Sequence, residues 1–198
     1  QEEIDTSNKE YNEAEQSLLG IVDDMRKNKY IVEKKYGNVS SFNFTRDAFY
    51  KSKWDEMTTK ARGLFIDTVE GRVVARSYDK FFNYGELYKT KPEALRFSLK
   101  FPVTAYRKEN GFLALLSYDK ENDDLFIASK STPDGPFALL AREIILKSTE
   151  DVAAIKEYLK KNNVTFVFEC IDPGNDPHII KYDKAKVVLL DIVNNKMS

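Results

Sequence analysis

Residues 107–130 read RKENGFLALLSYDKENDDLFIASK and predict part of an antiparallel sheet. Apolar and polar side chains alternate over Phe112–Tyr118 and Leu125–Lys130, as expected for strands with one buried face. Asn122-Asp123-Asp124 between them has the composition of a tight turn, not the spaced oxygen ligands of a calcium site. Asn110-Gly111 is a common hairpin signal, so we predict a further strand over Val103–Lys108.

The same reasoning extends the predicted fold in both directions. Further strands are predicted at Gly63–Asp67, Arg72–Ser77, Val164–Ile171, His178–Lys181 and Val187–Val193. Helices are predicted at Glu15–Lys29, Thr45–Thr59 with Thr45 as its N-cap, Pro136–Lys147 and Thr149–Lys161 behind a Ser148 cap. Strands, then helices, then strands, joined by tight turns, indicate an α+β fold.

Charge is divided unevenly along the 198 residues. The formal net charge of -1 seems to argue against a nucleic-acid-binding protein. Residues 1–24, however, hold eight acids and one base, a net charge of -7, so the remaining residues carry +6. The hydrophobic content of 42% excludes wholesale disorder. The basic character of residues 25–198, which follow an acidic head over residues 1–24, therefore remains compatible with nucleic-acid binding.

The single cysteine and single histidine exclude several kinds of site. One Cys170 cannot form an internal disulfide framework or a cysteine-based zinc site, and one His178 excludes a two-histidine metal centre. We expect Cys170 to be a buried small hydrophobe and Trp54 to be a packing residue. No apolar run approaches the roughly 18–20 residues of a membrane helix. We therefore expect a cytoplasmic protein without membrane association.

Four motifs accompany the lysine turn at 108–111. By itself, Lys-x-Asn-Gly is only a typical turn. The others are Arg62-Gly63-Leu64-Phe65, Asp79-Lys80-Phe81-Phe82-Asn83, Ser129-Lys130-Ser131 and Phe168-Glu169-Cys170-Ile171. Cations at strand ends around a lysine turn could bind a triphosphate. The lone acid Glu169 is costly to bury in an apolar strand unless it has a partner.

With these motifs, residues 45–193 resemble the covalent nucleotidyltransferases, and among them the ATP-dependent RNA ligases. The similarity is greatest to phage-type RNA ligases and to the ligase domain of fungal tRNA ligases. The Lys-Phe-Phe-Asn run is its most specific element. The resemblance implies an α+β nucleotidyltransferase domain, ATP-grasp-like, with antiparallel sheets and flanking helices.

The resemblance also implies site residues and a reaction. Lys108 would take AMP from ATP, with Mg²⁺ on the phosphates, and AMP would pass to an RNA 5′-phosphate that a 3′-hydroxyl then attacks. The residues implied to bind the nucleotide are Arg62, Gly63, Lys80, Phe82, Asn110, Gly111, Lys130 and Glu169. Glu169 would take the ribose hydroxyl or a metal-bound water. Aromatic stacking on adenine is expected, but the sequence does not identify the ring.

The sequence departs from the family pattern at two points. Asn110 stands where most of the superfamily has Asp. Fungal tRNA ligases also have Asn at this position. No Glu-Gly follows Glu169, and Lys184-Ala185-Lys186 is predicted to be a solvated turn rather than the final lysine motif. We therefore expect residues 1–198 to form one adenylyltransferase domain without its C-terminal motifs, with an acidic, poorly ordered start over 1–16. End-healing kinase or phosphatase domains are possible partners.

Other functions stay open at this point. One is a catalytically incomplete domain of the same fold that binds nucleotide or RNA without turnover. Others are a DNA ligase, a capping-type guanylyltransferase and an α+β interaction domain without a site. If the ligase hypothesis is right, six cations should converge on a phosphate-binding cleft, with the acidic head opposite or mobile. These are Arg62, Arg76, Lys80, Arg107, Lys108 and Lys130.

Overall fold

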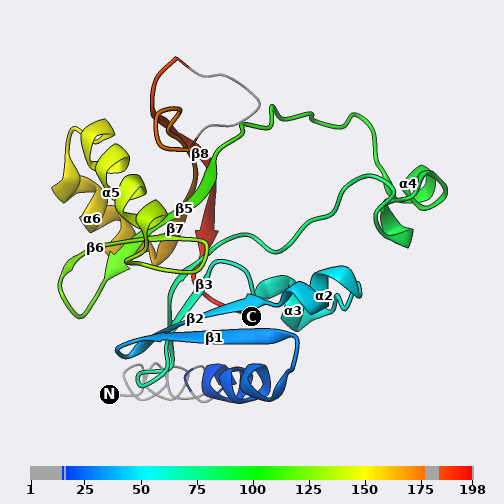
Figure 1. Cartoon of the computed structure of the whole chain (residues 1–198), viewed down its shortest axis with the longest axis horizontal. Coiled ribbons are helices and arrows are strands. Elements are labelled where there is room, and N and C mark those ends of the chain that lie inside the picture. The colour runs from blue at the N-terminus through cyan, green and yellow to red at the C-terminus, as the bar shows by residue number, and fades with distance from the viewer. Residues whose placement is uncertain (1–14, 16, 177–182, 198) are drawn as a thin grey trace, which may run out of the picture.

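A computed structural model describes residues 15, 17–176 and 183–197, which form two four-stranded antiparallel sheets (Figure 1). The first sheet has the order β1-β2-β3-β4, and the second has the order β6-β5-β7-β8. The strands of the first are β1 (Ile31–Tyr36), β2 (Val39–Phe44), β3 (Leu64–Asp67) and β4 (Arg72–Arg76). Those of the second are β5 (Phe112–Asp119), β6 (Asp124–Ser129), β7 (Val164–Ile171) and β8 (Lys186–Asn194). The predicted α+β class is confirmed.

Helices cover the sheets on their outer faces. A helix over residues 17–27 packs on the first sheet, where Val22 and Met25 join the same core cluster as Phe42 of β2. Helices α5 (Pro136–Ser148) and α6 (Val152–Asn162) lie side by side on the second sheet (Figure 1). The short helices are α2 (Arg46–Tyr50), α3 (Glu56–Lys60), η1 (Tyr88–Thr90) and α4 (Pro92–Ser98). No helix within the described ranges combines the length and apolar composition needed to cross a bilayer.

The two sheets share one core cluster, which fixes their relative position. Phe65 and Val74 of the first sheet are buried with Leu115 and Val167 of the second. The buried hydroxyl of Ser117 also donates to the Val74 carbonyl at 2.7 Å. Residues at the strand ends of one sheet are therefore held at a constant distance from those of the other.

Several predicted elements differ from the observed ones. The predicted helix over Thr45–Thr59 is two short helices, because Ser52 has a left-handed backbone (φ 50°) and Asp55 caps a new helix. Helix α6 starts behind Asp151, whose side chain accepts from Ala154 N at 3.0 Å. The predicted Ser148 cap is wrong because this hydroxyl donates back to the Ile144 carbonyl at 2.7 Å.

The predicted strand over Val103–Lys108 is also wrong. These residues have no regular structure and pair with no strand. Lys184 and Ala185 form an exposed bend, as predicted, but Lys186 begins β8. The predicted strand His178–Lys181, like nearly all of the predicted start over 1–16, lies outside the described residues.

The connection between β4 and β5 leaves both sheets. We call residues 84–107 the arm; it runs away from the sheets and carries α4 at its far end (Figure 1). Its aromatic side chains are largely exposed, with 88% of Phe97 and 87% of Tyr106 accessible. The arm ends at the lysine turn, so Lys108 stands where the arm returns to the second sheet.

Candidate active site

A cleft of about 1030 Å³ opens where the arm meets the second sheet. The predicted nucleophile Lys108 lines it, together with four of the predicted nucleotide-binding residues: Arg62, Gly111, Lys130 and Glu169. Arg62 precedes β3, Lys108 and Gly111 precede β5, and Lys130 follows β6. Residues at or near strand ends of both sheets therefore supply cationic groups to the same cleft, which two acids, Glu109 and Glu169, also line.

Glu169 is half-buried in β7 and has a hydrogen-bond partner there. It faces Leu113 across the β5–β7 ladder, and Gly111 N donates to its Oε1 at 2.8 Å. A Cβ at residue 111 would overlap the Cys170 carbonyl oxygen and lie 2.8 Å from its carbon, so only glycine fits. The hydrogen bond and this close approach fix the end of the lysine turn against β7.

Positive charge is concentrated in the cleft without a matching set of acids. Desolvation lowers the pKa of Lys130, and the nearby charges of Arg62 and Lys80 lower it further, although part of this side chain is exposed. Arg62 Nη1 is buried and makes no hydrogen bond to any described residue. Such a group is suited to donate a hydrogen bond to an anionic oxygen of a ligand, as a triphosphate would provide.

The other predicted binding residues lie around the cleft and do not line it. Gly63 lies behind it, where a Cβ would come within 3.0 Å of the Ser77 Cβ. Lys80 Nζ donates to the Phe81 carbonyl at 2.7 Å and lies 4.5 Å from the centre of the Phe82 ring. Phe81 lines the cleft, whereas Phe82 lines a separate hollow with Trp54. Asn110 is next to the lining residue Gly111.

The six cations expected to converge do so only in part. Arg62, Arg107, Lys108 and Lys130 line the cleft. Arg107 pairs with Glu109 through Nε at 3.3 Å, which offsets part of its charge. Arg76 and Lys80 do not line it, although Lys80 lies close enough to affect Lys130. The acidic head lies mostly outside the described residues.

Sequence reasoning missed the aromatic walls of the cleft. Tyr78, Phe81, Tyr106 and Phe137 all line it, and Tyr78 lies 5.6 Å below the Arg62 guanidinium. The spacing of Tyr78 and Phe81, around Asp79-Lys80, is visible in the sequence. It does not show which rings face the cleft, because the backbone there is irregular. These rings can supply the stacking surface expected for adenine.

The remaining predictions concern groups outside the cleft. Trp54 packs edge-on against Phe44 at 4.9 Å, as expected of a packing residue, and it also lines a second hollow outside the cleft. Cys170 is fully buried, and burial raises the pKa of its thiol to about 12, so it is an inert core residue as predicted. Among the described residues, no group of three or more His, Cys, Asp or Glu side chains could hold a metal ion.

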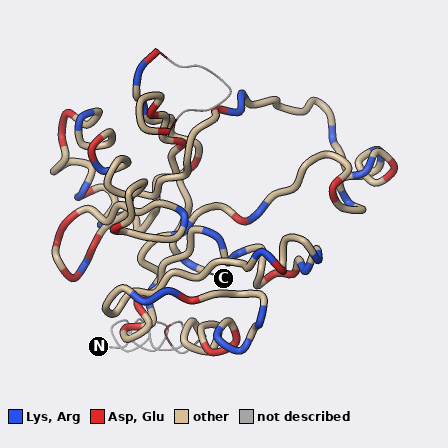
Figure 2. The backbone as a smooth tube through the Cα atoms, viewed as in Figure 1, with Lys and Arg blue, Asp and Glu red and all other residues tan. Residues whose placement is uncertain are grey.

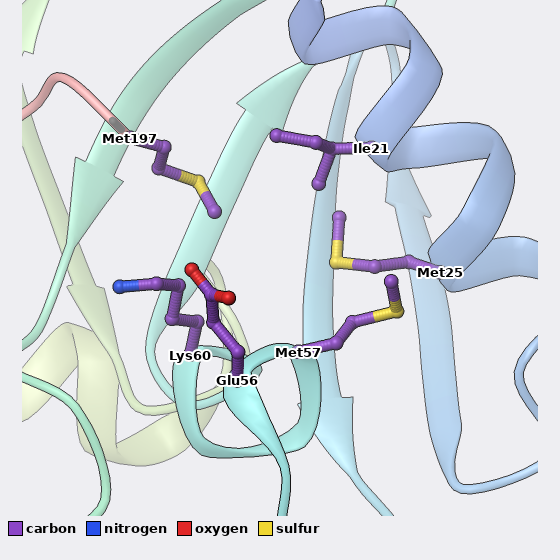
Figure 3. Close-up of a pocket in the computed structure, with 6 residues that line it drawn as sticks. All are labelled: Ile21, Met25, Glu56, Met57, Lys60 and Met197. Atoms are coloured by element: carbon purple, nitrogen blue, oxygen red, sulfur yellow. The ribbon is translucent and has the colours of Figure 1, made fainter.

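A smaller pocket of about 240 Å³ lies apart from the cleft, between α3 and the helix at residues 17–27 (Figure 3). Met25, Met57 and Met197 form most of its wall, with Glu56 and Lys60 at one side. Its lining is apolar and shares no residue with the cleft.

Comparison with known proteins agrees with this geometry. A model of the RNA ligase family matches residues 60–198, which include every predicted binding residue. A tRNA ligase of Candida albicans is 28% identical over 182 residues, covering 75% of this chain and 21% of the relative. A tRNA ligase 1 of Schizosaccharomyces pombe is 28% identical over 140 residues, covering 64% and 18%. The chain thus spans about a fifth of the length of these relatives, and it belongs to the RNA ligase family.

Proposed function

We propose that the chain is the adenylyltransferase domain of an ATP-dependent RNA ligase, with Lys108 as the residue that becomes adenylylated. The observation that carries this proposal is the position of Lys108 in one cleft with Arg62, Lys130 and Glu169. A nucleophile, two cations and a carboxylate in one cleft are the groups that nucleotidyl transfer requires.

The proposed reaction has three steps. The neutral Lys108 amine attacks the α-phosphorus of ATP, a P–N bond forms, and the P–O bond to pyrophosphate breaks. An oxygen of an RNA 5′-phosphate then attacks the same phosphorus and releases the lysine. Finally, a 3′-hydroxyl attacks the RNA 5′-phosphorus, loses its proton and expels AMP. Arg62 and Lys130 would offset the phosphate charge throughout.

Magnesium fits this proposal as a partner of the phosphates rather than of a protein cage. The described residues contain no three-ligand acidic cluster. Mg²⁺ commonly keeps several waters and is held by substrate phosphates plus one or two carboxylates. Glu169, the one acid of β7 that lines the cleft, is the residue we propose to hold a metal-bound water or the ribose.

RNA with a 5′-phosphate and a 3′-hydroxyl is the proposed substrate, in RNA repair or tRNA splicing. The two relatives are named tRNA ligases, which favours the second process. Association with end-healing kinase or phosphatase activities is part of the proposal, because a ligase of this type needs those ends to be prepared. A cytoplasmic location is part of it too.

The test is transfer of label from [α-³²P]ATP to the protein in the presence of Mg²⁺. We expect the wild type to retain label through denaturation and Lys108→Ala to retain none. Lys100→Ala is the matched control, because it removes an exposed lysine from the arm outside the cleft. Equal labelling of Lys108→Ala and wild type would refute the proposed nucleophile.

A second candidate function is a domain that binds nucleotide or RNA without turnover. Binding of ATP without a covalent adduct, in the full-length protein as well, would support it. Labelling by GTP instead of ATP would indicate a capping-type enzyme, and sealing of nicked DNA but not RNA would indicate a DNA ligase.

A further inference from the structure

A second hollow, lined by the aromatic residues Trp54, Phe82 and Tyr88, lies near residue 84, where the arm begins. It has a volume of about 500 Å³ and is shared between the α2–α3 region and the arm. The Trp54 and Phe82 rings meet edge-on at 5.3 Å, and Tyr88 stands beside them with 78% of its surface exposed. Open aromatic faces of this kind let unpaired bases stack.

Lysine ammonium groups lie over these rings. Lys80 Nζ is 4.5 Å from the centre of the Phe82 ring and 5.5 Å from that of Trp54. Lys89 Nζ lies 5.8 Å from the Phe82 ring. Aromatic faces with flanking cations match a strand of stacked bases and phosphates, not an apolar peptide.

The surrounding segment has the same character. Residues 80–108 hold seven bases and two acids, a net charge of +5, and Figure 2 shows blue Lys and Arg segments along the arm. Two acids do line the hollow. The Asp55 carboxylate is occupied in capping α3, where it accepts from Thr58 N at 2.8 Å. Glu56 also lines the methionine pocket of Figure 3, where its carboxylate lies beside Lys60.

The hollow and the cleft are neighbours. Phe81 lines the cleft and the next residue, Phe82, lines the hollow. Lys80 lies against the hollow's rings and is close enough to Lys130 of the cleft for its charge to act there. A strand bound in the hollow can therefore continue into the cleft.

We infer that this hollow binds an unpaired base of the RNA strand whose end is to be joined, stacked on Tyr88, Trp54 and Phe82, with Lys80 and Lys89 at the flanking phosphates. The inference rests on the proposed function for the identity of the strand. It adds a binding site for single-stranded RNA outside the nucleotide cleft.

Trp54 is the only tryptophan of the chain, so its fluorescence reports on this hollow alone. We expect a single-stranded ten-nucleotide oligoadenylate with a 5′-phosphate to quench Trp54 emission and to bind with the same midpoint in fluorescence anisotropy. The same oligonucleotide paired with oligouridylate should not quench, because its bases are already stacked and paired. ATP alone should leave the emission unchanged.

Matched variants separate stacking from charge. Tyr88→Ala should weaken oligoadenylate binding by on the order of tenfold. Phe97→Ala removes an equally exposed ring from α4, outside the hollow, and should bind like wild type. Lys89→Gln should reduce the slope of log K against log salt by about 0.7, and Lys161→Gln on α6 should not. Unfolding curves for all four variants verify that each is folded.

Oligoadenylate that binds without quenching Trp54, or that binds Tyr88→Ala and Phe97→Ala equally, would overturn the inference. So would failure of the folded chain to bind it at all. Adenylylation of Lys108 is read out separately by label from ATP and does not depend on the hollow. Quenching of Trp54 without formation of lysyl-AMP would therefore support the RNA site and refute the proposed function. Formation of lysyl-AMP without quenching would support the proposed function and refute the RNA site.

Discussion

The arm and the second sheet hold the proposed catalytic groups in different ways. We call the part of the second sheet that lines the cleft, including Glu169 of β7, the wall. Glu169 lies within a four-stranded sheet, and a hydrogen bond and the close approach of Gly111 to the Cys170 carbonyl fix its surroundings. Lys108 lies at the end of an exposed segment without regular structure, between an exposed Arg107 and a Glu109 side chain that is only 10% exposed. Glu169, which we propose to bind the nucleotide, is thus held by the sheet, while the proposed nucleophile is attached through a segment with little packing of its own.

This difference matters for the proposed reaction, in which Lys108 would serve three successive steps. It would approach the α-phosphate, carry AMP and then release AMP to a second substrate. Segments with few buried contacts open at low free-energy cost, whereas strands at the centre of a sheet open only near the cost of global unfolding. In the proposed function, a sheet that holds the phosphate-binding groups in place would thus be combined with a nucleophile whose position can adjust.

Limited trypsin digestion tests the largest contrast between arm and wall. We expect Lys89, Arg96 and Lys100 of the arm to be cut at least about a hundredfold faster than Lys147 and Lys161 of helices α5 and α6, because the arm, including its short helices η1 and α4 that bury no residue, opens at low free-energy cost. Mass spectrometry of early time points identifies the sites. First cuts within α5 or α6 would contradict the contrast.

Substitution of Gly111 tests the junction between the two regions. Gly111→Ala places a Cβ against the Cys170 carbonyl, which is backbone and cannot turn away. We expect a loss of about 2–4 kcal/mol in the free energy of unfolding, measured with urea. Gly20→Ala is the control, because no atom lies within 4 Å of the added Cβ there. Equal stability of the two variants would show that the junction is not tightly packed.

Glu169 tests the wall itself. Glu169→Ala leaves the Gly111 N–H without its acceptor, so we expect a loss of about 1–2 kcal/mol in the free energy of unfolding. Glu169→Gln keeps an acceptor oxygen and should lose less. Glu93→Ala on the arm, in the first turn of α4, should change stability by no more than about 0.5 kcal/mol.

If Glu169→Ala and Glu93→Ala unfold at the same urea concentration, the contact with Gly111 contributes nothing to the wall. Labelling from ATP then distinguishes stability from chemistry. Glu169→Gln should fold like wild type and still label poorly, since it has lost the charge proposed to act on the ribose or on metal-bound water.

The sequence predicted the wall much better than the arm. Strand Val164–Ile171 was predicted to the residue, and β5 within one residue, because their alternating apolar side chains face two core clusters. The hairpin of β1 and β2 was missed because β2 buries Ser40, Ser41 and Asn43, so the polar sequence hides a buried strand. Val103–Lys108 failed for the opposite reason: Val103 and Tyr106 are residue types that favour strands, but here they face solvent.

The candidate site shows the same division. Lys130 and Glu169 could be placed at predicted strand ends, and both line the cleft. The resemblance placed Phe82 at the nucleotide, whereas Phe81 lines the cleft and Phe82 lines the hollow, because on an irregular segment no periodicity determines which ring faces which side. Which of the two neighbouring rings faces the cleft and which faces the hollow depends on backbone angles that only the structure provides.

Substitution of Lys130 should have the smallest effect on stability of the changes considered. It separates the contribution of this lysine to stability from its contribution to nucleotide binding. Its pKa is lowered by desolvation and by Arg62 and Lys80, so its charged form is less stable in the folded chain than in the unfolded chain. At pH 7 the lysine is protonated in both states and the folded state carries this cost. The cost decreases as pH rises from the lowered pKa toward the ordinary lysine value.

Lys130→Met removes the cost, so we expect a gain of a few tenths of a kcal/mol, about 0.3–0.5, in the free energy of unfolding at pH 7 without nucleotide. Lys100→Met on the arm should give no such gain. With ATP and Mg²⁺ the order reverses, because the wild type gains more from nucleotide binding than a cleft that has lost a cation. Thermal unfolding with and without nucleotide measures both. A less stable Lys130→Met without nucleotide would mean that Lys130 supports the wall, and an equal nucleotide-induced shift would mean that it does not contact phosphate.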